Sequence, residues 1–147
     1  MIYQRFNLAQ VLLLLIMILV SVKVLAEDLA SSQQWKIVNY WSLWCGPCRV
    51  EIPELNLLSK ELAQFDVVLV GVNYDEDPRE KTLKIAQRMG IDFPTLEIDT
   101  VRSLQLEAPH VLPTTYILDS NNKVMAKLVG AQDRESLKKV LIEQGAM

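Results

Sequence analysis

Two cysteines, Cys45 and Cys48, are the only thiols in the chain, and two residues separate them. The local sequence is Trp44-Cys45-Gly46-Pro47-Cys48. Two thiols at this spacing can close a reversible disulfide and exchange it with a disulfide of another molecule through a mixed disulfide. The cysteine pair therefore predicts thiol–disulfide exchange.

The position of the motif predicts different roles for the two sulfurs. A β-branched and aromatic strand is predicted over 35–41, and a helix with a broad apolar face is predicted over 47–64. Cys45 then lies at the helix N-terminus, where free N–H groups and the helix dipole favour a thiolate, so we expect a lowered pKa and a nucleophile. Cys48, one turn further along, is expected to be more buried and to resolve the mixed disulfide.

Two other uses of the cysteine pair are weaker. A disulfide across two residues closes a very small loop and removes little entropy from the unfolded chain, so it is a poor structural staple. A zinc site needs further ligands, for which only His110 and carboxylates remain. We expect no metal and no cofactor besides the redox-active disulfide of Cys45 and Cys48. A non-catalytic binding module or metal carrier stays open as an alternative.

The remaining pattern predicts the elements that position this pair. Strands are predicted over 35–41, 66–73, 114–118 and 123–129, and helices over 47–64, 77–89, 101–107 and 133–144. The initial strand–helix–strand unit predicts a parallel pair with a right-handed crossover, and the later hairpin adds antiparallel strands. The fold class is therefore α/β, with a mixed central sheet flanked by helices.

The acidic turn after the second strand carries a helix start signal. Asp77, Pro78 and Glu80 match N-cap, first-turn proline and third-position acid, which predicts a capping box. Gly90 is the expected end of that helix. Residues 75–77 are predicted to form a solvated turn and not a metal loop, because the regular alternation of ligands is missing.

Residues 1–26 have the composition of a targeting segment. Arg5 precedes ten uninterrupted apolar residues at 11–20, a length that fits a signal peptide better than a membrane-spanning helix. Cleavage is expected after Ala26, and an uncleaved membrane anchor is the alternative. Residues 27–34 are predicted to be a short linker and 35–147 one domain, located in the periplasm or tethered to the periplasmic face of the inner membrane.

The charge of the domain excludes one class of partner. Of 15 Lys and Arg residues, Arg5 and Lys23 lie in the first 26 positions, whereas all 18 Asp and Glu residues follow them. Residues 27–147 thus carry 13 basic and 18 acidic side chains, a formal charge of −5. This balance argues against nucleic-acid binding, which requires a basic face.

Taken together, these motifs resemble the thioredoxin superfamily. Within it the chain is most similar to the TlpA/ResA/DsbE-like membrane-associated thiol–disulfide oxidoreductases, and the resemblance covers nearly all of Trp35–Gln144. The matching stretches are Val38-Asn39-Tyr40-Trp41-Ser42-Leu43-Trp44-Cys45, Cys48-Arg49-Val50-Glu51-Ile52-Pro53, Val70-Gly71-Val72-Asn73-Tyr74-Asp75 and Leu112-Pro113-Thr114-Thr115-Tyr116-Ile117-Leu118-Asp119. The resemblance implies a thioredoxin fold.

The resemblance also implies a substrate site. Pro113 would be a cis-proline facing the two sulfurs, with the backbone of Leu112 offered to a bound substrate strand; an ordinary trans proline at a strand edge is the alternative. The substrate-binding residues expected on this basis are Trp44, Gly46, Pro47, Leu112 and Pro113. Protein thiols and disulfides would be the substrates, and a membrane electron donor would be a partner.

Three positions depart from patterns within the superfamily. Asn39 and Gly71 stand where cytosolic-type thioredoxins keep a buried Asp and a Lys, and a neutral Asn39 cannot take a proton from Cys48. Glu51 matches an acid of the TlpA/ResA-like group and is the candidate to help deprotonate Cys48; a solvated helix-face carboxylate is the alternative. Thr114 stands where cytochrome c maturation members often carry Glu.

The spacer and the resemblance favour one direction of reaction. Cys-Gly-Pro-Cys is the spacer at the reducing end of the superfamily, near about −270 mV, whereas the strong oxidant of the superfamily lies near about −120 mV. We therefore expect a reductase of protein disulfides, with a disulfide oxidase or isomerase as the alternative.

Overall fold

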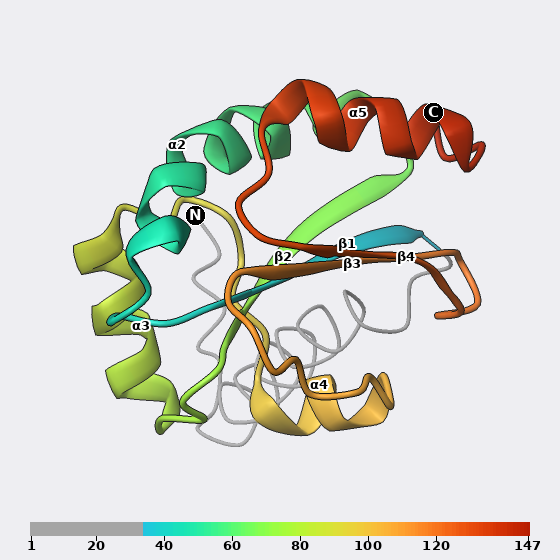
Figure 1. Ribbon diagram of the computed structural model, residues 1–147. Coiled ribbons are helices and arrows are strands. Elements are labelled where there is room, and N and C mark those ends of the chain that lie inside the picture. The colour runs from blue at the N-terminus through green and yellow to red at the C-terminus, as the bar shows by residue number, and fades with distance from the viewer. Residues whose placement is uncertain (1–33) are drawn as a thin grey trace, which may run out of the picture. The chain divides into compact units, whose positions relative to one another are not determined.

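The computed structural model describes residues 34–147 (Figure 1). Within these residues, four strands and four helices follow one another in the predicted order of β, α, β, α, α, β, β and α. Their bounds are β1 Trp35–Trp41, α2 Gly46–Glu61, β2 Val67–Asn73, α3 Arg79–Met89, α4 Ile98–Ser103, β3 Thr114–Leu118, β4 Val124–Val129 and α5 Arg134–Glu143.

The strands form one mixed sheet in the order β2-β1-β3-β4. β1 and β2 are parallel, and β3 is antiparallel to both β1 and β4. The parallel pair and the hairpin are thus both confirmed. β1 lies inside the sheet between β2 and β3. The cysteine motif follows directly after the carboxyl end of this central strand.

Alternate side chains of β1 face two different apolar layers. Ile37 packs with Leu55 and Leu58 of α2 and with Leu137 and Leu141 of α5. On the opposite side, Val38 and Tyr40 pack with residues of β2 and with the α4 region. Figure 1 shows α2 and α5 on one face of the sheet and α4 on the other. The odd-numbered residues of β1 therefore face α2, which carries the cysteines.

The start of α3 differs from the sequence prediction. The cap of α3 is Pro78, whose carbonyl accepts from the backbone N–H of Thr82 at 2.9 Å, and no side chain caps this end. The predicted capping box at Asp77 is therefore wrong, because the Asp77 carboxylate is bound to Lys81 and Asn73 instead. Gly90 does end α3, in the left-handed conformation at φ 73°.

The short helix α4 begins three residues earlier than predicted. It covers Ile98–Ser103 and not 101–107. Gln105 has a φ of 52°, in the left-handed region that ends a right-handed helix, so the helix cannot continue to Glu107. The predicted helix 47–64 becomes α2 followed by a 3-10 turn at Leu62–Gln64.

The predictions for residues 1–26, and for all of the linker except Gln34, lie outside the described part of the chain. Within residues 34–147, none of the helices combines the length and the apolar character needed to cross a bilayer.

Candidate active site

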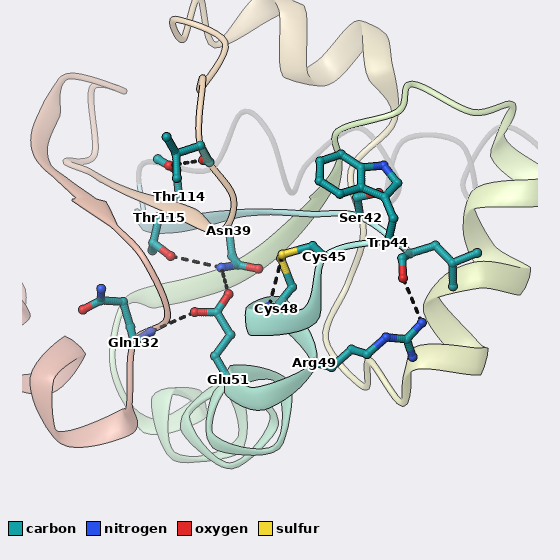
Figure 2. The surroundings of a disulfide bond; sticks show 12 residues. Asn39, Ser42, Trp44, Cys45, Cys48, Arg49, Glu51, Thr114, Thr115 and Gln132 are labelled. Carbon is teal, nitrogen blue, oxygen red and sulfur yellow. Dashed lines mark hydrogen bonds between the residues drawn. A yellow bond between two sulfur atoms is a disulfide. The ribbon is translucent and has the colours of Figure 1, made fainter.

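The two cysteines form a disulfide at the start of α2 (Figure 2). Their Cα atoms are 5.3 Å apart. Cys45 is the N-cap residue, and its Sγ accepts a hydrogen bond from the backbone N–H of Cys48 at 3.2 Å. Cys45 is 3% exposed and Cys48 is fully buried. The helix-start position of Cys45 and the deeper burial of Cys48 are as predicted.

The residues around the disulfide form an exposed rim. Trp44 is 65% exposed, and Gly46 and Pro47 are also exposed. Leu112 is half-buried and packs against the apolar cluster that contains both cysteines. The peptide bond between Leu112 and Pro113 is cis, as predicted. The structure thus brings the rim of the motif and the cis-proline loop together at one end of the sheet.

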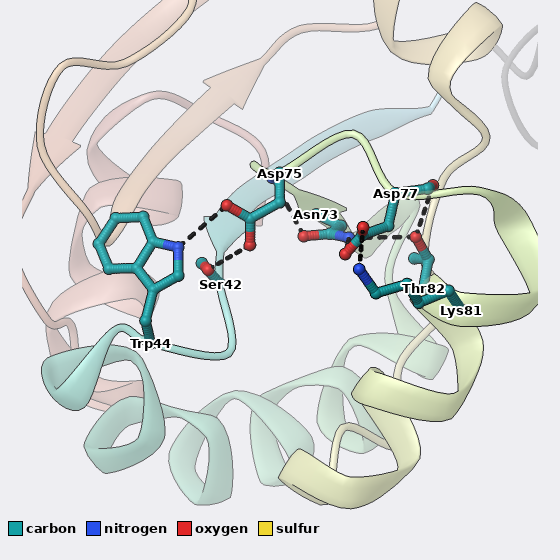
Figure 3. A network of polar contacts seen from close by, with 7 residues as sticks. All are labelled: Ser42, Trp44, Asn73, Asp75, Asp77, Lys81 and Thr82. Atoms are coloured by element: carbon teal, nitrogen blue, oxygen red, sulfur yellow. Dashed lines mark hydrogen bonds and ion pairs between the residues drawn. The ribbon is translucent and has the colours of Figure 1, made fainter.

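The exposed indole of Trp44 is held by the loop after β2 (Figure 3). Its Nε1–H donates to Oδ1 of Asp75 at 2.9 Å, and the hydroxyl of Ser42 donates to Oδ2 of Asp75 at 2.5 Å. The Trp44 ring also contacts Tyr74 edge-on, with centroids 6.2 Å apart. Asp75 is exposed, as predicted, but its carboxylate is also a fixed acceptor for two residues of the motif turn.

Further polar contacts hold the Asp75 loop against α3. The backbone N–H of Asp75 donates to Oδ1 of Asn73 at 3.2 Å, and the Asn73 amide donates to Asp77 at 3.2 Å and to Thr82 at 3.1 Å. Lys81 completes the network through an ion pair with Asp77 at 2.6 Å (Figure 3). The orientation of Trp44 therefore depends on side chains that are distant from it in sequence.

Glu51 is a buried carboxylate one turn beyond Cys48. Only 2% of it is exposed. Oε1 accepts from the Asn39 amide at 2.8 Å, and Oε2 accepts from the backbone N–H of Gln132 at 2.9 Å (Figure 2). Burial raises the pKa of Glu51 to about 7, although both hydrogen bonds oppose this rise. The alternative of a solvated helix-face carboxylate is wrong.

Asn39 and Gly71 are neighbours across the sheet. Asn39 of β1 pairs in register with Gly71 of β2 and with Thr115 of β3. A Cβ atom at Gly71 would lie 2.7 Å from Nε1 of Trp41 and 3.0 Å from a ring carbon of Phe93. The space beside Gly71 is thus filled by two aromatic rings, which explains why no larger side chain stands there.

The ligands considered for a zinc site do not gather. His110 is exposed. Among residues 34–147, no group of three or more His, Cys, Asp or Glu side chains could hold a metal ion.

Several residues of the site were not recognised from the sequence. Asn39 was noted only as a missing acid, although a polar residue at an inward-facing position of an apolar strand could have indicated it. Thr115 shows the same signal on β3. Gln132 contributes only its backbone N–H, 81 residues from Glu51, and no sequence pattern indicates such a contact.

The sequence is similar to known protein families and to individual proteins. The family model described as "AhpC/TSA family" matches residues 21–127. The Thiol-disulfide oxidoreductase ResA of Geobacillus thermodenitrificans (strain NG80-2) is 33% identical over 104 residues, which are 71% of this chain and 59% of that protein. The Thioredoxin-like protein YneN of Bacillus subtilis (strain 168) is 30% identical over 129 residues, 82% of this chain and 74% of that protein.

A solved structure supports the fold. The DsbF homologue from Corynebacterium diphtheriae superposes with a TM-score of 0.64 at 24% identity, covering 79% of this chain and 75% of that one. The chain spans about three fifths of the length of the ResA proteins that it matches. The family match covers most of the chain and agrees with the observed sheet, helices and cysteine pair, so this protein belongs to the thioredoxin-like AhpC/TSA family.

Proposed function

We propose that this protein is a thiol–disulfide oxidoreductase that reduces disulfides of other proteins outside the cytoplasm. The observation that carries the proposal is the Cys45–Cys48 disulfide at the first turn of α2, beside the cis bond before Pro113. The names of similar proteins, including "Thiol-disulfide oxidoreductase ResA" and "Thiol:disulfide interchange protein HelX", support the same reaction class.

The proposed reaction begins from the reduced protein. The Cys45 thiolate attacks one sulfur of the substrate disulfide, forming a mixed disulfide and releasing the other substrate sulfur as a thiolate that takes up a proton. Cys48 then loses its proton and attacks Sγ of Cys45. The second substrate thiol leaves, and the Cys45–Cys48 disulfide forms, so that two electrons have passed to the substrate.

Glu51 is proposed to assist the second step. Its carboxyl titrates near neutrality because it is buried, and a base is most useful when its pKa lies close to the working pH. It lies on the same helix as Cys48, three residues later. We expect Glu51→Gln to shift the pH profile of thiol exchange, and an unchanged profile would remove this role.

Insulin reduction with dithiothreitol as the electron source tests the reaction itself. Cys45→Ser should abolish the protein-dependent rate, because no nucleophile remains. Cys48→Ser should instead accumulate a mixed disulfide at Cys45 that mass spectrometry detects, because nothing resolves it. Equal turnover by wild type and Cys45→Ser would contradict the proposed activity.

The direction of reaction is tested by a redox titration against glutathione. A reductase should have a midpoint potential well below about −200 mV, whereas an oxidase or isomerase should lie above it. The Cys-Gly-Pro-Cys spacer supports the reducing direction, and a midpoint above this value would support the alternative.

The location is proposed from residues 1–26, whose charge and apolar run favour export or anchoring. Because the periplasm is kept oxidising, a reductase there needs a dedicated electron donor, for which a membrane thiol donor is proposed. A reporter enzyme that works only outside the cytoplasm should be active when it is fused after Gln144, and one that works only inside the cytoplasm should be inactive there. The opposite pattern would contradict the location and leave the chemistry untouched.

A further inference from the structure

Within residues 34–147, Oδ1 of Asn39 and Nε1 of Trp41 are buried near the redox centre without a hydrogen-bond partner. Among the described residues, Oδ1 of Asn39 is a buried side-chain oxygen without a hydrogen bond. The same amide uses its nitrogen twice, donating to Oε1 of Glu51 at 2.8 Å and to Oγ1 of Thr115 at 3.0 Å. Buried polar atoms are almost always paired, so an unpaired oxygen on an otherwise bound amide requires an explanation.

The orientation of the amide follows from its neighbours. In the structure the NH₂ group faces Oε1 of Glu51 and Oγ1 of Thr115, so the amide oxygen points the other way. The ionised form of Glu51 favours this orientation, because a carboxylate can only accept hydrogen bonds. Figure 2 shows this oxygen turned toward the side of the disulfide, while the nitrogen points to Glu51 and Thr115. Asn39 is fully buried, so water cannot freely reach the oxygen.

The neighbours of Asn39 along β1 indicate that its amide lies on the same side of the sheet as the cysteine pair. On the face of β1 that meets α2, Ile37 packs against Leu55 and Leu58, whereas Trp41 packs in the cluster of Cys45 and Cys48. Asn39 lies between these two positions. Its carboxylate partner Glu51 likewise lies between Cys48 and Leu55 along α2.

We propose that Oδ1 of Asn39 is the hydrogen-bond acceptor of the Cys48 thiol in the reduced protein. In the disulfide state Cys48 has no S–H, so the oxygen is unpaired, as observed. A dithiol such as dithiothreitol supplies two electrons and two protons: the Cys45–Cys48 bond breaks, and the dithiol becomes a disulfide. One proton stays on Sγ of Cys48, and this S–H group donates a hydrogen bond to Oδ1 of Asn39. The other proton goes to Cys45 or to solvent.

Two consequences follow for the site. The acceptor stabilises the dithiol relative to the disulfide, so it opposes the loss of electrons from this protein. The Asn39 amide also stands between Glu51 and Cys48, bound to the first through its nitrogen and to the second through its oxygen. Besides the base role proposed above, Glu51 therefore orients the acceptor of the Cys48 thiol by holding this amide. This second consequence rests on the function proposed above, whereas the thiol–amide bond itself does not.

Infrared spectroscopy of Cys45→Ser tests the bond directly, because Cys48 is then the only thiol in the chain. Its S–H stretch should lie at the low frequency of a hydrogen-bonded thiol and should move to the free-thiol frequency in Cys45→Ser/Asn39→Leu. Cys45→Ser/Thr115→Val is the matched control. It removes the other neighbour of the amide, keeps the oxygen, and should leave the band in place. An S–H band that is identical with and without Asn39 would overturn the proposal.

Two further measurements keep the test independent of how well the double variant folds. In the wild type labelled with ¹³C-asparagine, a side-chain carbonyl band should move to lower frequency on reduction; a difference spectrum without such a band contradicts the proposal. In glutathione equilibria, Asn39→Leu should disfavour the dithiol by about five- to tenfold, the usual worth of one hydrogen bond. A tenfold change corresponds to about 30 mV. Thr115→Val should stay within about twofold of wild type.

These outcomes separate the bond from the function. If insulin is not reduced but the S–H band shifts as expected, the function fails and the acceptor role stands. If insulin is reduced and neither the band nor the glutathione equilibrium depends on Asn39, the function stands and the acceptor role fails.

Discussion

Glu51 is an ionisable residue that is buried against the preference of its side chain for water. A carboxylate that is 2% exposed loses most of its hydration, and its two N–H donors restore only part of it. The loss of hydration raises the pKa of Glu51 and the two hydrogen bonds lower it, and the result is a pKa of about 7. A neutral amide would turn its NH₂ group toward Asn39 or Gln132, both of which are donors, so the two oxygens of the acid fit this site. A pKa near neutrality is also consistent with proton transfer near Cys48.

The burial of Glu51 predicts a pH-dependent stability. The folded protein binds the proton of Glu51 more tightly than the unfolded chain does, because the pKa is raised in the folded state. The contribution of this proton to the unfolding free energy is complete below the ordinary pKa of 4.5 and is lost as the pH rises through about 7. Since each tenfold change in proton affinity is worth about 1.4 kcal/mol, the unfolding free energy should fall by about 3 kcal/mol over that range.

Denaturant unfolding of wild type and Glu51→Gln across pH 4–8 measures this loss. The amide does not titrate, so the difference between the two proteins should follow the loss assigned to Glu51, while the other acids cancel. Parallel curves at all pH values would mean that Glu51 does not titrate in this range.

Asp75 is the residue that fixes the exposed Trp44 next to the disulfide. Asp75→Asn keeps the shape but turns one NH₂ group toward Ser42 or Trp44, both of which are donors, so one bond is lost. We expect the KM for insulin to rise about threefold at nearly constant kcat, because docking and not chemistry is affected. Glu76→Gln removes the same charge from the same turn without a contact to the motif, and an equal rise in this control would assign the effect to charge alone.

At the scale of elements, the junction of β1 and α2 sets the reactivity. β1 brings Asn39 and Trp41 to the face of the sheet that α2 covers, and the turn after β1 makes Cys45 the N-cap of α2. The neighbouring β2 supports this arrangement by presenting Gly71 without a side chain, so that the ring of Trp41 can lie against the strand backbone.

This close approach predicts a specific cost for a methyl group. Gly71→Ala should destabilise the fold by about 1–3 kcal/mol, because the new Cβ meets two buried aromatic rings. Thermal or denaturant unfolding measures the change. Gly46→Ala is the control: a Cβ there has no neighbour within 4 Å, and its effect should stay within about 0.5 kcal/mol. Equal stability of wild type and Gly71→Ala would show that the rings can move away at little cost.

At the scale of the whole molecule, the redox state and the stability of the fold are linked. Reduction and unfolding connect four states in a closed cycle, so a disulfide that is harder to reduce in the folded protein than in the unfolded chain must stabilise the folded protein. The proposed reductase should therefore be more stable oxidised than reduced, by about 1.4 kcal/mol for each 30 mV of difference.

Unfolding in denaturant with and without dithiothreitol measures this difference. The double variant Cys45→Ser/Cys48→Ser should not respond to the reductant. A reduced form that is more stable than the oxidised one would indicate an oxidase, since strong oxidants of this superfamily are those whose reduced form is stabilised.

Much of this architecture is determined locally and could be predicted. The order of elements, the bounds of β1 and β3 within a residue, and the end of α3 at Gly90 follow from apolar periodicity and from glycine, which act over a few residues. The helix-start position of Cys45 follows from the same local pattern. The cis bond before Pro113 was implied by resemblance to a family and is observed.

The sequence by itself determined the α/β fold class and the reactive pair, because these depend on residue type and short spacing, whereas Glu51 was implied by resemblance to a family. Only the tertiary structure decided that Glu51 is buried, that Asp75 holds Trp44, and that the Asn39 amide donates to Glu51. The physical reason is the length of chain between the partners. Contacts such as that between Glu51 and Gln132 form only when α5 closes over the sheet, and no local preference encodes them.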